Sequence, residues 1–418
     1  MEKRIYGTLK GCVTPPPSKS QAHRLLICAA LGCEPCSIVC SAVNDDIMAT
    51  MRCLNALGAR ITFSSGVFDV QPICVTPNGT LDCGESGSTL RFLMSVAAVL
   101  GANATFTGAG KLPQRPMGAL TDVLAAHGMS FERQSADELP VICHGTLQGG
   151  KYTLPGNISS QYLTGLLFAL PLATQDSEIE VTGGLTSASY IDMTIDALRI
   201  AGISVVRSGN IFKIKGNQRY RMPQRVVVEG DWSSAAFWAV AGVIGKEPVT
   251  ICGMNNATLQ GDSAIIDHLR SMGAFIVIDN DKVVAMPSHL FGTELDCMDT
   301  PDLVPVLSVA AAVAQGTTTF TNVGRLRFKE SDRLAAMKSV LDAFGIASSI
   351  GEDTFAVYGG NPAVVTPVDS FNDHRIAMSA AVMSTVASGV TTINGSACVA
   401  KSYPSFFEDF VALGGVVE

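Results

Sequence analysis

An amphipathic helical pattern that ends at a glycine and leads into a β-branched strand recurs along the whole chain. The glycines that end these patterns lie 69 to 74 residues apart: Gly58, Gly128, Gly202, Gly273, Gly345 and Gly414. Glycine can adopt the left-handed conformation that stops a helix, so each of them predicts a helix C-terminus. This regular spacing predicts six copies of one structural unit of about 70 residues.

Each copy also contains a second helical pattern that is apolar on nearly every side. These patterns cover residues 24–31, 89–100, 162–173, 235–244, 303–314 and 375–387. A helix that is apolar all round is buried. With β-branched strands such as residues 60–63, 204–207 and 275–278, each copy reads as βαβαββ. Three copies per domain predict two similar α/β domains with sheets outside and buried helices inside.

Cationic side chains stand beside the expected starts of several buried helices. The Ser, Asp and Asn residues at these places are ordinary helix caps. Lys19, Arg24, Arg91 and Arg375 are different, because the positive end of the helix dipole repels a cation unless an anion lies nearby. Repeat symmetry would direct several of these helix ends to one place. We therefore expect a cleft between the two domains that binds a small ligand with several negative charges.

Charge and hydropathy argue against two classes of partner. The net charge of −8 and the pI of about 5.3 disfavour nucleic acid, whose binding proteins carry a basic face. The longest apolar stretch, residues 304–314, has about half the length that a bilayer requires. The N-terminal residues show no leader pattern, so we expect a cytoplasmic protein.

The 12 cysteines suit a reducing compartment, where thiols behave as small apolar groups and disulfides are rare. Cys28, Cys33, Cys36 and Cys40 include spacings that begin an iron–sulfur ligand pattern. They lie on an apolar helix end and a strand, with no matching CxxC or His pair elsewhere. We therefore interpret them as core residues and expect no metal.

Charged residues gather in a few short segments of a chain in which only 16% of residues are charged. Residues 325–333 carry four basic side chains; as a helix start they would place Lys329 and Arg333 on one face, with Glu330 beside them. A solvated helix start with weak ion pairs is the alternative. Residues 15–24, 85–91 and 372–375 and Lys401 are the other candidates, and His23 and His374 suit either packing or catalysis.

At these five places the chain resembles the 5-enolpyruvylshikimate-3-phosphate synthases. The matching motifs, in family order and at about the family's separations, are SKSQAHR, ESGSTLR, RLRFKESDR, NDHR and AKSYP. The likeness covers essentially the whole chain. It implies an inside-out α/β barrel type of fold, with one enolpyruvyl transferase domain at residues 18–229, a second at residues 1–17 and 230–418, and the active site in the cleft between them.

The resemblance also implies which residues bind the two substrates. Those around phosphoenolpyruvate would be Lys19, Gly87, Arg91, Arg115, Gln161, Arg333, Arg375 and Lys401. Those around shikimate 3-phosphate would be Ser20, Arg24, Ser159, Ser160, Gln161, Ser187, Asp302 and Lys329, with Tyr190 closing one side. Guanidinium groups suit carboxylate and phosphate, and hydroxyls suit a polyhydroxylated ring.

The implied reaction adds the 5-hydroxyl to C2 of phosphoenolpyruvate and then expels phosphate from a tetrahedral intermediate. It needs acid–base groups and a cationic cage, with no cofactor. Glu330 is the expected proton donor to C3 and Asp302 the expected acceptor of the hydroxyl proton. Lys19 and Lys329 are alternative proton carriers, and the sequence leaves open which group serves which step. Family likeness also implies a monomer.

Other functions remain to be weighed. The sister enzyme that acts on UDP-N-acetylglucosamine commonly carries a reactive Cys in the loop that corresponds to residues 108–115, where this chain has none. A two-domain anion-binding protein would have no use for Glu330 among cations. Glu85 stands where many relatives have Asn, so we do not expect it to bind phosphoenolpyruvate. Gly87 matches the position at which a side chain hinders the herbicide glyphosate.

Overall fold

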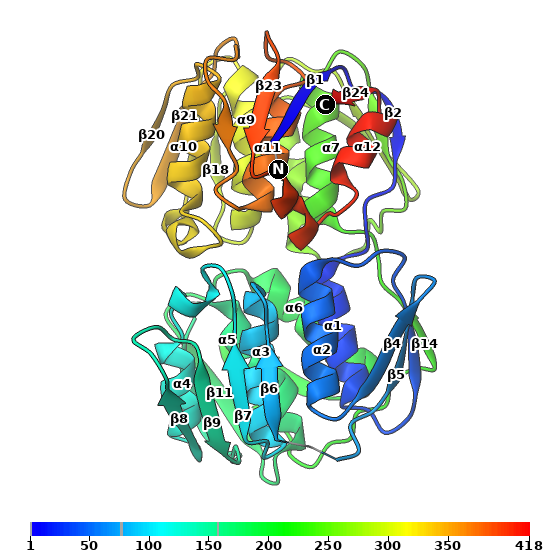
Figure 1. Ribbon diagram of the computed structural model, residues 1–418, viewed down its shortest axis with the longest axis vertical. Coiled ribbons are helices and arrows are strands. Elements are labelled where there is room, and N and C mark those ends of the chain that lie inside the picture. The colour runs from blue at the N-terminus through cyan, green and yellow to red at the C-terminus, as the bar shows by residue number, and fades with distance from the viewer. Residues whose placement is uncertain (1, 76–77, 157–158) are drawn as a thin grey trace. The chain divides into compact units, whose positions relative to one another are not determined.

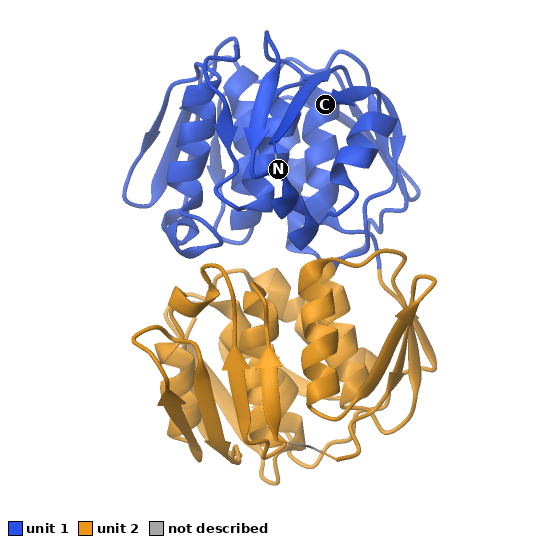
Figure 2. Ribbon diagram, in the orientation of Figure 1, with its two compact units in different colours: residues 1–18, 229–418 blue, residues 19–228 orange. Residues whose placement is uncertain are grey.

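The computed structural model describes residues 2–75, 78–156 and 159–418. It contains two compact units, coloured separately in Figure 2: unit 1 is Met1–Ser18 with Glu229–Glu418, and unit 2 is Lys19–Val228. The chain passes from one unit to the other after residue 18 and again after residue 228. The limits expected from the sequence lie within one residue of these positions.

Both units are built from four-stranded sheets of one topology, and three such sheets are present in the described part of each unit. The first strand is parallel to the second, and the remaining pairs are antiparallel. The sheets of unit 2, in strand order, are β14 (Arg225–Val227), β3 (Cys36–Val39), β5 (Val67–Gln71), β4 (Arg60–Ser64); β6 (Gly79–Asp82), β7 (Ala104–Thr107), β9 (Val141–Gly145), β8 (Met129–Arg133); and β10 (Lys151–Pro155), β11 (Ser177–Thr182), β13 (Ile211–Ile214), β12 (Val205–Ser208).

Unit 1 repeats this arrangement. Its sheets are β2 (Gly11–Val13), β15 (Val249–Ile251), β17 (Lys282–Met286), β16 (Phe275–Asp279); β18 (Glu294–Asp296), β19 (Thr317–Thr321), β21 (Thr354–Tyr358), β20 (Ser348–Ile350); and β22 (Val368–Asp369), β23 (Thr391–Asn394), β1 (Glu2–Gly7), β24 (Gly415–Val417). The repeat is closed at the chain ends, because β1 takes the place that the last strand of a copy would fill.

The predicted apolar helices form the interior of each unit, with the sheets outside them (Figure 1). They are α1 (Lys19–Ala30), α3 (Gly87–Val99) and α5 (Ser160–Ala169) in unit 2, and α7 (Trp232–Ile244), α9 (Val304–Val313) and α11 (His374–Met383) in unit 1. α7, α9 and α11 pack against one another. α9 shows why: its sequence VPVLSVAAAV has no charged residue and small side chains that allow close approach. The predicted inside-out α/β architecture is therefore confirmed.

The second helix of each copy ends at the predicted glycine. These helices are α2 (Asp45–Ala56), α4 (Gly118–Ala125), α6 (Ala188–Ile200), α8 (Ile265–Ser271), α10 (Arg333–Ala343) and α12 (Phe406–Ala412). All six glycines have φ between 71° and 103°, the left-handed region that favours glycine. No described helix is long and apolar enough to cross a membrane.

Two short strands pair within the unit that the chain is about to leave. β2 precedes α1 in the chain, yet it pairs with β15 in unit 1. β14 precedes α7, yet it pairs with β3 in unit 2. A sheet of unit 1 thus contains β2, from the segment that leads into α1 of unit 2. A sheet of unit 2 likewise contains β14, from the segment that leads into α7 of unit 1.

The cysteines differ from expectation at one pair. Cys12 and Cys252, beside each other at β2 and β15, form a disulfide, so the prediction of thiols is wrong for these two. The other cysteines, all in the described part of the chain, carry free thiols. In the segment that resembled a ligand pattern, burial raises the pKa of Cys36 to about 11 and of Cys40 to about 12, while Cys33 is exposed.

Candidate active site

Lys19 is the first residue of α1, in unit 2. Its ammonium group forms an ion pair with Asp46 in the first turn of α2, with Nζ and Oδ2 3.0 Å apart. This carboxylate offsets the repulsion between a lysine and the positive end of its own helix. Sequence reasoning missed Asp46, because Asn44 followed by acidic residues is an ordinary helix start; Asn44 does cap α2 by accepting from Ile47 N at 3.0 Å.

Arg24 lies one turn further along α1 and is 2% exposed. Its guanidinium donates to the carbonyl oxygens of Ser20 (2.7 Å) and Tyr190 (2.9 Å) and to Thr194 Oγ1 (2.9 Å). Burial lowers its pKa to about 10, which leaves it cationic at neutral pH. The structure thus places three residues predicted for one substrate, Ser20, Arg24 and Tyr190, next to one another.

Arg91, Gln161 and Ser88 form a hydrogen-bonded row across the first turns of α3 and α5. Arg91 Nη1 donates to Gln161 Oε1 at 2.6 Å, and Gln161 Nε2 donates to Ser88 Oγ at 3.0 Å. Gly87 lies against Arg115: a Cβ at residue 87 would be 2.8 Å from Arg115 Nη1. The predicted residues Gly87, Arg91, Arg115 and Gln161 therefore lie together, and Ser88 joins them.

The predicted serines lie at the starts of two helices. Ser159 caps α5, and its Oγ accepts from Gln161 N at 3.3 Å; Ser160 is the first residue of that helix. Ser187 precedes α6 with φ of 55°, a left-handed conformation that is uncommon for a residue other than glycine. Backbone strain of this kind clusters at ligand sites.

In unit 1, Asp302 gathers the predicted cations. Its Oδ1 lies 3.2 Å from Lys329 Nζ and 2.7 Å from Arg333 Nη1, and its Oδ2 lies 3.4 Å from Arg375 Nη2. Arg375 also donates to the carbonyl oxygen of Asp302 at 3.0 Å. One carboxylate from the turn before α9 thus meets two cations of its own copy of the repeat and one, Arg375, of the next copy.

Arg333 is the most enclosed of these cations, with 2% of its side chain exposed. It also pairs with Glu330 (Nη2–Oε2 2.7 Å) and with the fully buried Asp373 (Nε–Oδ2 2.8 Å). Ser331 Oγ donates to Asp373 at 2.9 Å. Sequence reasoning gave Asp373 no role, because a residue that caps α11 looks like an ordinary helix start. The alternative of weak, solvated ion pairs is wrong for Arg333.

Residues 325–333 do not form the start of one helix. Residues Gly324–Phe328 form a 3-10 turn, residues 329–332 are extended or bent, and α10 begins at Arg333, capped by Asp332. Lys329 and Arg333 therefore do not share a helix face as predicted. They meet at Asp302 instead. Lys401, at the end of the 3-10 segment Ser396–Lys401, donates to the carbonyl oxygen of Asn372 at 2.7 Å.

Charges around Asp302 set its protonation. Burial alone would raise its pKa, but Lys329, Arg375 and Arg333 together hold that pKa well below its usual value. Burial is the main reason that the pKa of Lys329 is lowered, and Asp302 opposes this shift. The ionised carboxylate of Asp302 thus faces Lys329, which is the cation of this cluster that loses its proton most readily.

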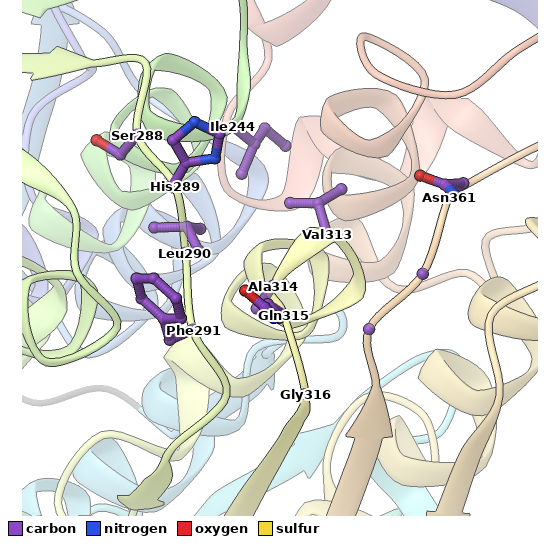
Figure 3. A pocket seen from close by; sticks show the side chains of 12 residues that line it. Ile244, Ser288, His289, Leu290, Phe291, Val313, Ala314, Gln315, Gly316 and Asn361 are labelled. Carbon is purple, nitrogen blue, oxygen red and sulfur yellow. The ribbon is translucent and has the colours of Figure 1, made fainter.

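The cavity in Figure 3 is separate from these residues. It has a volume of about 490 Å³ and lies in unit 1, where Ile244 and Val313 line it at the C-terminal ends of α7 and α9. Asp302 and Arg375 lie at the N-terminal ends of α9 and α11. The cavity is therefore not part of the candidate site.

Comparisons with known proteins identify the family of this chain. A family model described as EPSP synthase (3-phosphoshikimate 1-carboxyvinyltransferase) matches residues 3–410. Proteins named 3-phosphoshikimate 1-carboxyvinyltransferase from Clostridium kluyveri and Clostridium acetobutylicum are 42% and 40% identical to the chain, and each alignment covers 98% of this chain and 96% of the relative. A solved structure of EPSP synthase from Acinetobacter baumannii superposes with a TM-score of 0.85 at 26% identity, over 100% of this chain and 99% of the other. The chain therefore belongs to the EPSP synthase family.

Proposed function

We infer that this family member transfers the carboxyvinyl group of phosphoenolpyruvate to the 5-hydroxyl of shikimate 3-phosphate and releases phosphate. This is the reaction for which the curated relatives are named, and it belongs to the shikimate pathway. The observation that supports it most is the Asp302 cluster, in which Lys329, Arg333 and Arg375 are held by carboxylates. Anionic substrates can compete for cations held in this way.

We propose that residues of both units act on the same substrates. For phosphoenolpyruvate these are Lys19, Gly87, Arg91, Arg115 and Gln161 from unit 2, with Arg333, Arg375 and Lys401 from unit 1. For shikimate 3-phosphate they are Ser20, Arg24, Ser159, Ser160, Gln161 and Ser187 from unit 2, with Asp302 and Lys329 from unit 1. Bidentate guanidinium contacts suit the carboxylate and phosphate groups.

The proposed reaction has two steps. In the addition, the 5-oxygen bonds to C2 while C3 gains a proton, which gives a tetrahedral intermediate. In the elimination, the C2–O bond to phosphate breaks and C3 loses a proton, which restores the double bond. The fixed cations stabilise the negative charge that these steps move.

Acid–base roles follow from the contacts. Glu330, beside Arg333, is the proposed proton donor to C3. Because its pKa is held low, Asp302 is ionised and can accept a hydrogen bond from the 5-hydroxyl, whose proton then passes to Asp302 or to a lysine. Lys329, whose pKa is lowered, and Lys19 are the proposed alternatives. We further propose that the protein acts as a cytoplasmic monomer, which sedimentation of the pure protein would test.

Phosphate release from phosphoenolpyruvate and shikimate 3-phosphate tests this function directly. We expect release by the wild type and a loss of about a hundredfold or more in Glu330→Gln, as for the loss of a general acid. Glu294→Gln, an exposed residue on β18, is the matched control and should retain wild-type activity. Release that requires UDP-N-acetylglucosamine in place of shikimate 3-phosphate would contradict the assignment.

A further inference from the structure

His23 is a buried histidine one turn after Lys19 on α1, and the proposed reaction makes no use of it. It is 1% exposed. Its Nδ1 lies 2.7 Å from Thr50 Oγ1 on α2, while its Nε2 is buried and has no hydrogen-bond partner among the described residues. The ring meets Phe92 edge-on, with centroids 6.4 Å apart. A histidine enclosed in this way cannot exchange protons with a substrate directly.

Thr50 is the first link of a buried chain of hydroxyl groups. Its Oγ1 lies 2.7 Å from Thr89 Oγ1, and Thr89 Oγ1 donates to Ser86 Oγ at 2.7 Å. Ser86 caps α3 by accepting from Thr89 N at 3.2 Å. The side chains of Thr50, Thr89 and Ser86 have no exposed area. This chain of hydrogen bonds therefore joins the N-terminal halves of α1, α2 and α3, next to Gly87.

The hydrogen bonds from His23 through Thr50 and Thr89 to Ser86 can be donated in one direction only. Each hydroxyl has one proton to donate. Thr89 gives its proton to Ser86 or to the carbonyl oxygen of Asp46, so in either case Thr50 must donate to Thr89 and must then accept from His23. The proton of His23 is therefore on Nδ1, which leaves Nε2 as a bare acceptor. An unpaired acceptor is tolerated in protein interiors more often than an unpaired N–H.

His23 is also neutral. Burial, then the charges of Lys19 and Arg24, hold its pKa well below the usual value for histidine. These two cations are on its own helix, and the groups that face it from α2 and α3 are Thr50 and Phe92, which carry no charge.

We propose that His23 is a positioning residue that acts through Thr50 and Thr89. It fixes the Lys19 turn of α1 against the Ser86–Gly87 turn of α3. Thr89 Oγ1 also lies 3.4 Å from the carbonyl oxygen of Asp46, the ion-pair partner of Lys19. This chain of hydrogen bonds thus sets the distance between the Lys19 ammonium and the Gly87–Arg115 contact. Both are parts of the proposed phosphoenolpyruvate site, so this inference rests on the proposed function.

The first test needs no substrate and is independent of the reaction. Nitrogen-15 labelling of the histidines, with long-range proton–nitrogen correlation spectra, reports the tautomer of each ring. The signal that disappears in His23→Asn belongs to His23. We expect a neutral Nδ1–H ring from pH 6 to pH 8. An Nε2–H ring, or a ring that becomes protonated in this range, would overturn the proposal.

The second test removes a hydroxyl group from the middle of this chain of hydrogen bonds. Thr50→Val keeps the shape of the side chain and removes the hydroxyl, so kcat/KM for phosphoenolpyruvate should fall about tenfold to hundredfold, as for a small displacement of catalytic groups. Thr50→Ser keeps the hydroxyl and should restore activity to within about twofold. The shape of the pH–rate profile should not change, since His23 does not titrate.

Thr318→Val is the matched control. Thr318 is buried on β19 of unit 1, and its hydroxyl has no partner among the described residues. It should lose no activity. If Thr50→Val loses only stability and keeps the wild-type kcat/KM for phosphoenolpyruvate, the positioning role is wrong, whatever the spectra show.

Discussion

Asp262 is a buried carboxylate whose charge is poorly compensated. It is 3% exposed; Ser233 Oγ donates to its Oδ2, and its Oδ1 has no partner among the described residues. Burial is the main cause that raises its pKa to about 6, and Asp302 and Asp231 add to this effect while Arg375 opposes it. The ionised form is therefore destabilising in the folded protein.

Replacement of Asp262 by Asn tests this cost. A raised acid pKa means that stability is greatest below the unfolded value of 3.8 and is lost as the pH rises through about 6. Asp262→Asn should therefore be more stable than the wild type at pH 8, by about 1–3 kcal/mol, and should show no such gain at pH 4. Urea unfolding at both pH values measures this. An equal difference at the two pH values would show that the charge of Asp262 is not the cause.

Gly87 lies where an added methyl group would push against Arg115. The Cβ of Gly87→Ala would come within 2.8 Å of Arg115 Nη1, so the guanidinium must move. We expect lower sensitivity to glyphosate and a KM for phosphoenolpyruvate that rises about tenfold or less. Inhibition curves at fixed phosphoenolpyruvate compare the two proteins. Equal inhibition would reject the prediction.

At the scale of elements, Arg333 at the start of α10 joins two consecutive copies of the repeat, because Asp302 and Glu330 belong to its own copy and Asp373 to the next. Its contacts with Asp302, Glu330 and Asp373 leave it 2% exposed. Arg333→Met should cost about 3–5 kcal/mol, because it leaves the fully buried Asp373 without its cation. Lys338→Met, which breaks an exposed ion pair on the same helix, should have little effect. Equal losses in the two variants would contradict a buried network.

The same helix shows what the sequence could not predict. The charge density of residues 325–333 drew attention to Lys329 and Arg333, which meet at Asp302, but the start of the helix was predicted too early. Asp332 caps α10 and Lys329 turns toward Asp302, a contact between residues 27 positions apart that no local pattern encodes. Asp46 and Asp373 were missed for a related reason, because ordinary capping positions hid their ion pairs.

At the scale of the whole molecule, the fold was largely predictable because it is repeated. The six glycines and the apolar helices fix the period, and each copy supports the interpretation of the others. The places of β2 and β14 in their sheets were not predicted. These strands have three residues each, which is too few for a periodic signal. Their partners, β15 and β3, lie far from them in the sequence, so no local pattern predicts the pairing.

The central claim is that cations from both units serve one phosphoenolpyruvate molecule. It is tested most directly by the dependence of phosphate release on phosphoenolpyruvate at saturating shikimate 3-phosphate, in Arg91→Lys of unit 2 and Arg375→Lys of unit 1. Lysine keeps the charge but loses the bidentate geometry. The account predicts that kcat/KM for phosphoenolpyruvate falls about tenfold or more in both variants. A wild-type value in either variant would contradict it.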